Sequence, residues 1–123
     1  MRNMAYVDGF VLVVPKKNRA AYKKMAQMGK RMWMKKGAVD YKECRLTDPN
    51  SKYAKQTFPK LAKPRKGEEV WFSYVMYKNK KQRDRIMKEI DTEMREWAKK
   101  SDKKMVMPFD EKRMAYGGFV VEV

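Results

Sequence analysis

Apolar, aromatic and β-branched residues concentrate in residues 4–14, 69–77 and 112–123. Such runs are typical of β-strands, and Pro15 is placed to end the first of them. Residues 38–47 alternate only weakly between polar and apolar side chains, which predicts a second, more exposed strand in that position along the chain. The pattern therefore predicts four strands: residues 4–14, 38–47, 69–77 and 112–123.

Two segments carry apolar residues on the period of an amphipathic helix. The first runs from about residue 18 to residue 36, and Gly37 is placed to cap its end. The second starts at Asn79, which Gln82 follows three residues later as in a capping box, and it ends before Ser101. The apolar stripe of the first helix consists of Tyr22, Met25, Ala26, Gly29, Met32 and Trp33.

The order of elements is strand, helix, strand, strand, helix, strand, and residues 48–67, with three prolines, are predicted to be a long loop. This order predicts an α+β fold of the ferredoxin-like βαββαβ type, with a four-stranded antiparallel sheet and both helices on one face. At 123 residues, the chain is expected to form a single domain, residues 1–123. The central strands are apolar on both faces, so a second copy is expected to cover the face that the helices leave open.

Composition removes several classes of enzyme. The chain has no histidine and one cysteine, Cys44, which excludes a histidine-based triad and leaves no basis for a metal site or a cofactor. A single cysteine cannot form an internal disulfide and fits a reducing compartment. The apolar run at residues 10–14 is too short for a signal peptide or a membrane span. We therefore expect a cytoplasmic protein without a membrane partner.

Several motifs together resemble the YbaA-like family of small bacterial proteins, a domain of unknown function. They are YVDGFV at residues 6–11 and FSYVMY at 72–77, then the pairs Val14-Pro15, Gly37-Ala38, Glu43-Cys44 and Arg83-Asp84, and the long MPFD-x-KRM-x-YGGF at 107–119. The resemblance implies a dimeric α+β barrel, in which two ferredoxin-like subunits pack sheet against sheet. It implies no reaction, because the family has no established catalytic residue. The family usually has glycine where this chain has Glu111, which predicts a different turn here.

Two groups of residues are candidates for a ligand site. Asp8 lies within a strand among aromatic side chains, where a desolvated carboxylate would suit general-base work. Alternatively, it accepts a hydrogen bond from a backbone N–H or pairs with Lys112 or Arg113 of a neighbouring strand. Asp110 and Arg113 are either a pocket acid and an anion-binding base, or a turn acid and a solvated charge. The candidate ligand-binding residues are Tyr6, Asp8, Tyr74, Asp110, Arg113 and Tyr116.

Gly117 and Gly118 interrupt the last strand. A glycine within a strand marks a bulge or a close approach by a bulky group. The interpretation we favour is a bulge, or a backbone that lies under an aromatic ring such as Trp33; the alternative is the floor of a ligand site.

Positive charge is the strongest signal in the composition: 31 basic residues against 15 acidic ones give a net charge of +16. Residues 10–38 hold nine bases and no acid, and residues 50–66 hold six more, among them Lys60, Lys63, Arg65 and Lys66. Two functions therefore stay open. The protein binds a small organic ligand between sheet and helices, with enzymatic turnover undecided, or it is a basic accessory protein that binds nucleic acid non-specifically through helix 18–36 and loop 48–67.

Overall fold

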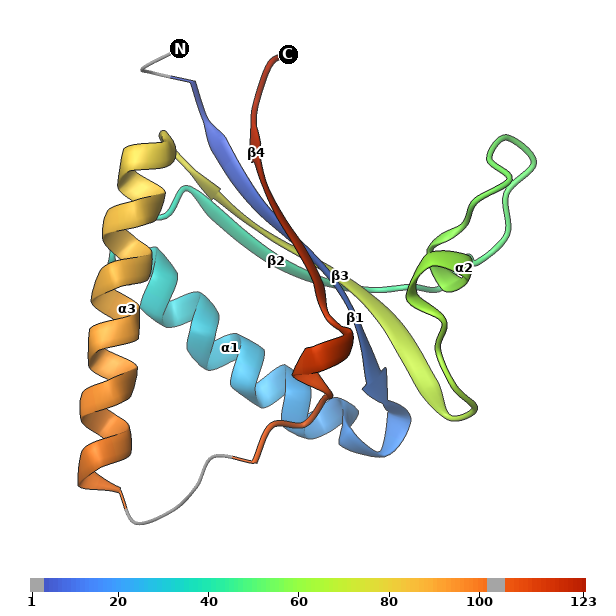
Figure 1. Cartoon of the computed structure of the whole chain (residues 1–123), viewed down its shortest axis with the longest axis horizontal. Coiled ribbons are helices and arrows are strands. Elements are labelled where there is room, and N and C mark those ends of the chain that lie inside the picture. The colour runs from blue at the N-terminus through green and yellow to red at the C-terminus, as the bar shows by residue number, and fades with distance from the viewer. Residues whose placement is uncertain (1–3, 102–105) are drawn as a thin grey trace.

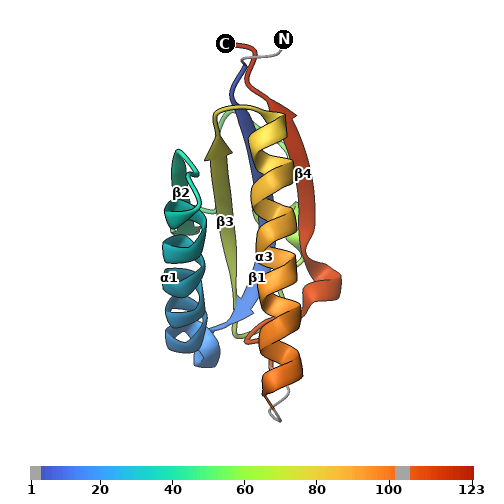
Figure 2. The ribbon, with the colours of Figure 1, turned by 90° about the vertical axis from the view of Figure 1, so that its left-hand side faces the viewer.

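A computed structural model of the protein describes residues 4–101 and 106–123. The chain forms an α+β fold, in which a four-stranded antiparallel sheet carries two long helices on one face (Figures 1 and 2). The strands are β1 (Tyr6–Pro15), β2 (Asp40–Arg45), β3 (Glu68–Tyr77) and β4 (Ala115–Val120), and the helices are α1 (Arg19–Lys35), α2 (Phe58–Ala62) and α3 (Lys80–Lys100). The four predicted strands and the two predicted long helices are thereby confirmed.

The short helix α2 corrects the prediction that residues 48–67 are a loop throughout. Pro59 occupies the first turn, where its missing N–H costs nothing, and Lys63 ends the helix in a left-handed conformation. The preceding turn residues hid this single helical turn, because a short helix carries almost no periodic signal.

The strands lie in the order β2-β3-β1-β4, and neighbouring strands are antiparallel. The two most apolar strands, β1 and β3, occupy the centre, where each is paired along both edges. The register places Asp8 opposite Val75 on one side and opposite Gly118 on the other. Cross-strand partners share a face, so this register decides which side chains meet the helices.

The core lies between the sheet and the two long helices, which run across the same face in Figure 2. One buried cluster joins α1 to the sheet and consists of Leu12, Val14, Tyr22, Ala26 and Trp71. A second cluster joins α3 to the sheet and consists of Ala38, Tyr41, Val75, Tyr77, Ile86 and Ile90. Both clusters use the tyrosines as well as the aliphatic residues, which places phenol hydroxyls inside the core.

The opposite face of the sheet is only partly covered. The α2 segment lies over one end of it, where the Phe58 ring meets the Phe72 ring at 6.1 Å and Val13 and Val70 are buried. Beyond this end, Phe72 remains 41% exposed and Phe119 60% exposed. We call the rest of this surface the open face; it carries Val7, Val11, Phe72, Tyr74, Met76 and Phe119.

Aromatic rings explain the glycines of the sheet. The Tyr6 ring lies so close to Gly118 that an added Cβ would meet the Tyr6 hydroxyl at 2.5 Å. On the other face, the Phe119 ring lies over Gly9 and Gly117, which are cross-strand partners. The prediction of glycines under an aromatic ring is confirmed, although the rings are Tyr6 and Phe119 rather than Trp33. The predicted bulge is wrong, because the register of β1 and β4 is continuous.

Glu111 fits its turn without strain. It begins a short 3-10 helix, Glu111–Arg113, and does not adopt a positive φ. The Asp110 side chain caps this turn by accepting a hydrogen bond from the Lys112 amide at 3.0 Å. Asp110 therefore has a structural task at the start of β4.

We expect Gly118→Ala to lower the free energy of unfolding by about 1–3 kcal/mol, the usual cost of overpacking. The Tyr6 ring would have to move, and it is held by the Arg83 guanidinium stacked over it at 4.9 Å. Gly9→Ala is the matched control, because its Cβ would meet Phe119 at an ordinary 3.6 Å. Urea denaturation followed by tryptophan fluorescence measures both. Equal stability of the two variants would contradict the packing described here.

Candidate functional site

Asp8 is the centre of a buried polar network between β1, β4 and α3. Its side chain is 2% exposed and pairs with the Arg83 guanidinium of α3 at 2.8 Å. The hydroxyls of Tyr116 and Tyr77 donate to the same carboxylate at 2.7 Å and 3.2 Å, and Trp33 donates to the Tyr77 hydroxyl at 3.0 Å. Two hydroxyl donors and one guanidinium cation thus satisfy this carboxylate.

The structure brings together three of the predicted site residues, Tyr6, Asp8 and Tyr116, around Arg83. It does not pair Asp8 with Lys112 or Arg113, so that interpretation of the carboxylate is wrong. Arg113 instead pairs with Glu68 at 2.7 Å. Sequence reasoning missed Arg83 because it comes from the helix after β3, which passes over β1 only in the folded chain.

Tyr74 lies on the other face of the sheet from Asp8. Its cross-strand partner on β1 is Gly9, and its hydroxyl donates to Asp40 at 2.8 Å. Asp110 and Arg113 belong to the turn before β4, where each is occupied by a local partner. The six predicted residues therefore do not line a single pocket.

A second carboxylate, Glu43 of β2, faces α1 on the helix side of the sheet. The hydroxyl of Tyr22 on α1 donates to one carboxylate oxygen at 2.7 Å, and the hydroxyl of Tyr41 donates to the other at 2.9 Å. Gly29 makes room for this arrangement, since a Cβ there would meet the Tyr41 hydroxyl at 2.9 Å. Glycine inside a helix costs roughly 1 kcal/mol of stability relative to alanine. The chain accepts this cost at position 29, where a larger residue would displace the Tyr41 hydroxyl.

Glu43 and Asp8 differ in one respect that decides their roles. Each accepts hydrogen bonds from two tyrosines, but within the described residues only Asp8 has a cation within salt-bridge distance. Burial raises the pKa of Glu43 above its ordinary value, and the hydrogen bonds from Tyr22 and Tyr41 offset this only in part. A half-buried carboxylate without a counter-ion costs stability, which is common where a residue serves function.

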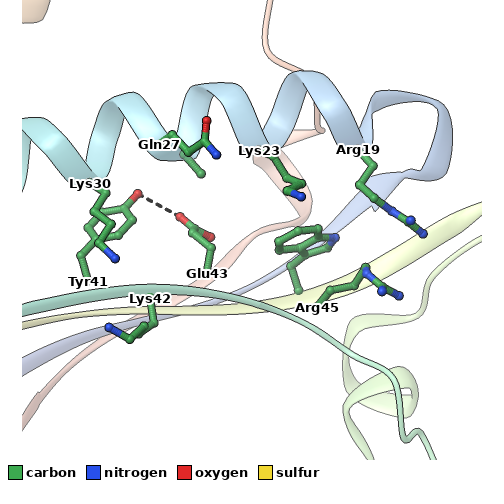
Figure 3. A pocket seen from close by; sticks show the side chains of 10 residues that line it. Arg19, Lys23, Gln27, Lys30, Tyr41, Lys42, Glu43 and Arg45 are labelled. Atoms are coloured by element: carbon green, nitrogen blue, oxygen red, sulfur yellow. Dashed lines mark hydrogen bonds between the residues drawn. The ribbon is translucent and has the colours of Figure 1, made fainter.

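A cleft of about 410 Å³ opens between α1 and β2, beside Glu43. Figure 3 shows Lys30, Gln27, Lys23 and Arg19 following one another along α1 above Tyr41, Glu43 and Arg45 of β2. Five cationic residues border the cleft: Arg19, Lys23, Lys30, Lys42 and Arg45. Lys42 points away from α1 and pairs with Asp40 at 2.7 Å, so the other four face the cleft together with the carboxylate of Glu43. The cleft is therefore a cationic site with one acceptor in its wall.

The remaining groups do not provide a metal site. Within residues 4–101 and 106–123, no cluster of three or more Cys, Asp or Glu side chains is arranged to hold a metal ion. Cys44 is exposed and its partner on β3 is Phe72, which places it on the side of β2 that faces away from α1. Among the described helices, none is both long and apolar enough to cross a membrane.

Comparison with known proteins gives a family without an assigned reaction. Residues 5–111 match the family described as protein of unknown function (DUF1428). The chain is similar to the uncharacterized protein YbaA of Escherichia coli (strain K12), with 38% identity over 119 residues, covering 94% of this chain and 95% of that protein. The YbaA protein of Shigella flexneri matches over the same shares and with the same identity.

Replacing each carboxylate with the neutral amide should change the free energy of unfolding in opposite directions at Glu43 and at Asp8. The folded state binds a proton at Glu43 more tightly than the unfolded chain does, because burial raises the pKa of this group. The stability that protonated Glu43 contributes is therefore lost as the pH rises above the ordinary pKa of a glutamate. We therefore expect Glu43→Gln to be at least as stable as wild type at pH 7. Asp8→Asn should lose roughly 1–3 kcal/mol, the cost of a broken hydrogen bond to a charged group.

Thermal unfolding at about pH 4 and about pH 7, on either side of most of the glutamate titration, measures both effects. Asp84→Asn is the matched control, because Asp84 also pairs with Arg83 but its side chain is 52% exposed. A large loss of stability in Glu43→Gln at pH 7 would mean that Glu43 is a structural group.

Proposed function

Because this chain belongs to DUF1428, a family of unknown function, we propose its function from the cleft itself: the protein binds a small organic anion between α1 and β2. The observation that carries the proposal is the separation of charges there. Four cationic side chains, those of Arg19, Lys23, Lys30 and Arg45, face a cleft of about 410 Å³, and none of them comes within salt-bridge distance of Glu43. The space between them has the volume of a small-molecule site.

Electrostatics favours an anion as the occupant. Lys23 and Lys30 make no salt bridge to any described residue, and Arg19 and Arg45 share the single carboxylate of Glu69. Cations that no carboxylate neutralises create a positive potential in the cleft, which attracts an anion. Trp71 and Ala26 supply the apolar part of the lining, which suits the carbon skeleton of an organic acid.

The fold and assembly that we propose follow from the same sheet. The strand order β2-β3-β1-β4 with the helices on one face supports the ferredoxin-like arrangement that we propose. A second copy packing on the open face would bury Phe72, Phe119 and the valines of β1, and would complete a dimeric α+β barrel. This assembly leaves the α1–β2 cleft of each subunit on the outer, helical side.

Nucleic acid is the second candidate ligand, favoured by the net charge of +16. The two segments predicted to contact it lie on different faces, since α1 packs on the helix side while Phe58 of α2 packs against Phe72 of the open face. A polyanion would have to pass around the edge of the sheet to reach both. This geometry favours a small anion in the cleft over a strand of nucleic acid.

We expect butyrate, a minimal organic carboxylate, to bind the cleft and to shift the indole N–H signal of Trp71 in an NMR titration. The double variant Lys23→Glu, Arg45→Glu should abolish this shift, because it reverses two of the four cationic side chains that face the cleft. Lys60→Glu with Arg65→Glu is the matched control: it changes the net charge equally but lies outside the cleft.

Duplex DNA at low salt tests the second candidate with the same three proteins: wild type, the cleft double variant and the loop double variant. If the loop variant loses DNA binding while no butyrate shift occurs in wild type, the nucleic-acid interpretation replaces the cleft. If butyrate shifts signals equally in wild type and in the cleft variant, the site lies elsewhere.

Assembly can be measured by sedimentation equilibrium at micromolar concentration. We expect a mass of twice the 14.7 kDa chain, and a monomer when Phe119 or Phe72 is changed to aspartate, because a charge would then have to be buried at the interface. Trp97→Asp is the control, since Trp97 is similarly exposed, at 47%, but lies on α3. A wild-type monomer would show that the open face needs no second copy.

A further inference from the structure

We infer that the ligand of this cleft is a short hydroxy acid, whose carboxylate lies at the Arg45 end and whose hydroxyl donates to Glu43. The inference rests on the proposed function and adds the class of ligand. It depends on the unequal ends of the cleft, which present donors at one end and an acceptor at the other.

The Arg45 end is built to receive an anion. Arg45 and Trp71 are cross-strand partners on the helix side of the sheet, and Arg19 of α1 comes down beside Arg45 in Figure 3. Glu69 pairs closely with Arg19 and more loosely with Arg45, at 3.7 Å, and its single negative charge balances only one of the two positive charges. One unit of positive charge therefore remains at this end, and Lys23 adds another.

Trp71 supplies an independent sign of a missing partner. Its residue is 5% exposed, and its indole Nε1 makes no hydrogen bond of normal geometry, interacting only loosely with Glu69. A buried N–H without a partner costs roughly 1–3 kcal/mol, so an acceptor is expected there in the liganded protein. The arginine side chains beside it are 42% and 39% exposed and can move to admit one carboxylate oxygen.

The Glu43 end accepts hydrogen bonds. A carboxylate has about four lone-pair sites, and the hydroxyls of Tyr22, Tyr41 and the cross-strand neighbour Ser73 use three of them, which leaves one acceptor site for a ligand. A second carboxylate on the ligand would be repelled by Glu43. An ammonium group would enter a cleft that four cations face, so a neutral hydroxyl is the donor that both conditions permit.

The sheet sets the length of the ligand. Glu43 and Arg45 are two residues apart on one strand, so their side chains stand about 7 Å apart. A short carbon chain between the carboxylate and the hydroxyl bridges this distance, and a longer ligand would extend past Glu43 towards Tyr41.

Four acids of one chain length test the inference by NMR titration: γ-hydroxybutyrate, butyrate, succinate and γ-aminobutyrate. We expect γ-hydroxybutyrate to bind roughly tenfold tighter than each of the others, the effect of one hydrogen bond to a charged group. Glu43→Gln should reduce its advantage over succinate to a small factor. Trp71→Phe should weaken all the acids that bind by a similar few-fold factor, because it removes the donor at the shared carboxylate end.

The outcomes separate the two proposals. If no acid binds, the proposed function fails. If all four bind alike, or succinate binds best, the cleft still binds anions but the hydroxy-acid assignment is overturned. Unchanged affinities in Trp71→Phe would overturn the placement of the carboxylate at the Arg45 end, and an undiminished preference in Glu43→Gln would overturn the placement of the hydroxyl.

Discussion

Hydrogen bonds from tyrosine hydroxyls to buried carboxylates organise the space between the sheet and the helices. Tyr77 and Tyr116 hold Asp8, and Tyr22 and Tyr41 hold Glu43. Tyr22, Tyr41 and Tyr77 each bring a large apolar ring into the core together with a donor that satisfies a carboxylate oxygen, whereas Tyr116 donates from a ring that is 55% exposed. The core can therefore contain two carboxylates, although an unsatisfied buried charge would be too costly.

The counter-ion separates the two sites. Arg83 completes the Asp8 network and ties α3 to β1 and β4, so this cluster stabilises the fold. Glu43 has tyrosine donors but no cation within salt-bridge distance among the residues described, and its pKa is raised by burial. The cationic side chains of α1 and β2 stand across a cleft from it instead. The unpaired Glu43 carboxylate lowers the stability of the fold, and the cleft separates it from the cationic side chains. Both features are common at ligand sites.

The sequence predicted most of the architecture because its signals are local. The apolar strands, the helix periods and the cap at Asn79 each depend on a few neighbouring residues, and the Asn79 cap is present, with the Gln82 amide donating at 2.8 Å. The site was harder, because it depends on register. Tyr74 was grouped with Asp8, yet its partner is Gly9, so it points to the other face. A shift of one residue in the strand register would move Tyr74 to the face of Asp8, and the local sequence pattern does not reveal the register.

Glu43 was overlooked because the segment around it alternates only weakly. The spacing of Tyr41 and Glu43, two residues apart on a strand, was the available signal, since it places both on one face. The mid-helix Gly29 was a second one: it was counted with the apolar stripe, whereas its lack of a side chain admits the Tyr41 hydroxyl. Arg83 could not be paired with Asp8 before the path of α3 was known.

The central claim is that the α1–β2 cleft retains a small organic anion. Mass spectrometry of the small molecules that co-purify with the native protein tests this directly, with Lys23→Glu, Arg45→Glu as the comparison. The account predicts that short carboxylic acids are retained by the wild-type protein and lost from the variant. The same acids on both proteins, or none on either, would contradict it.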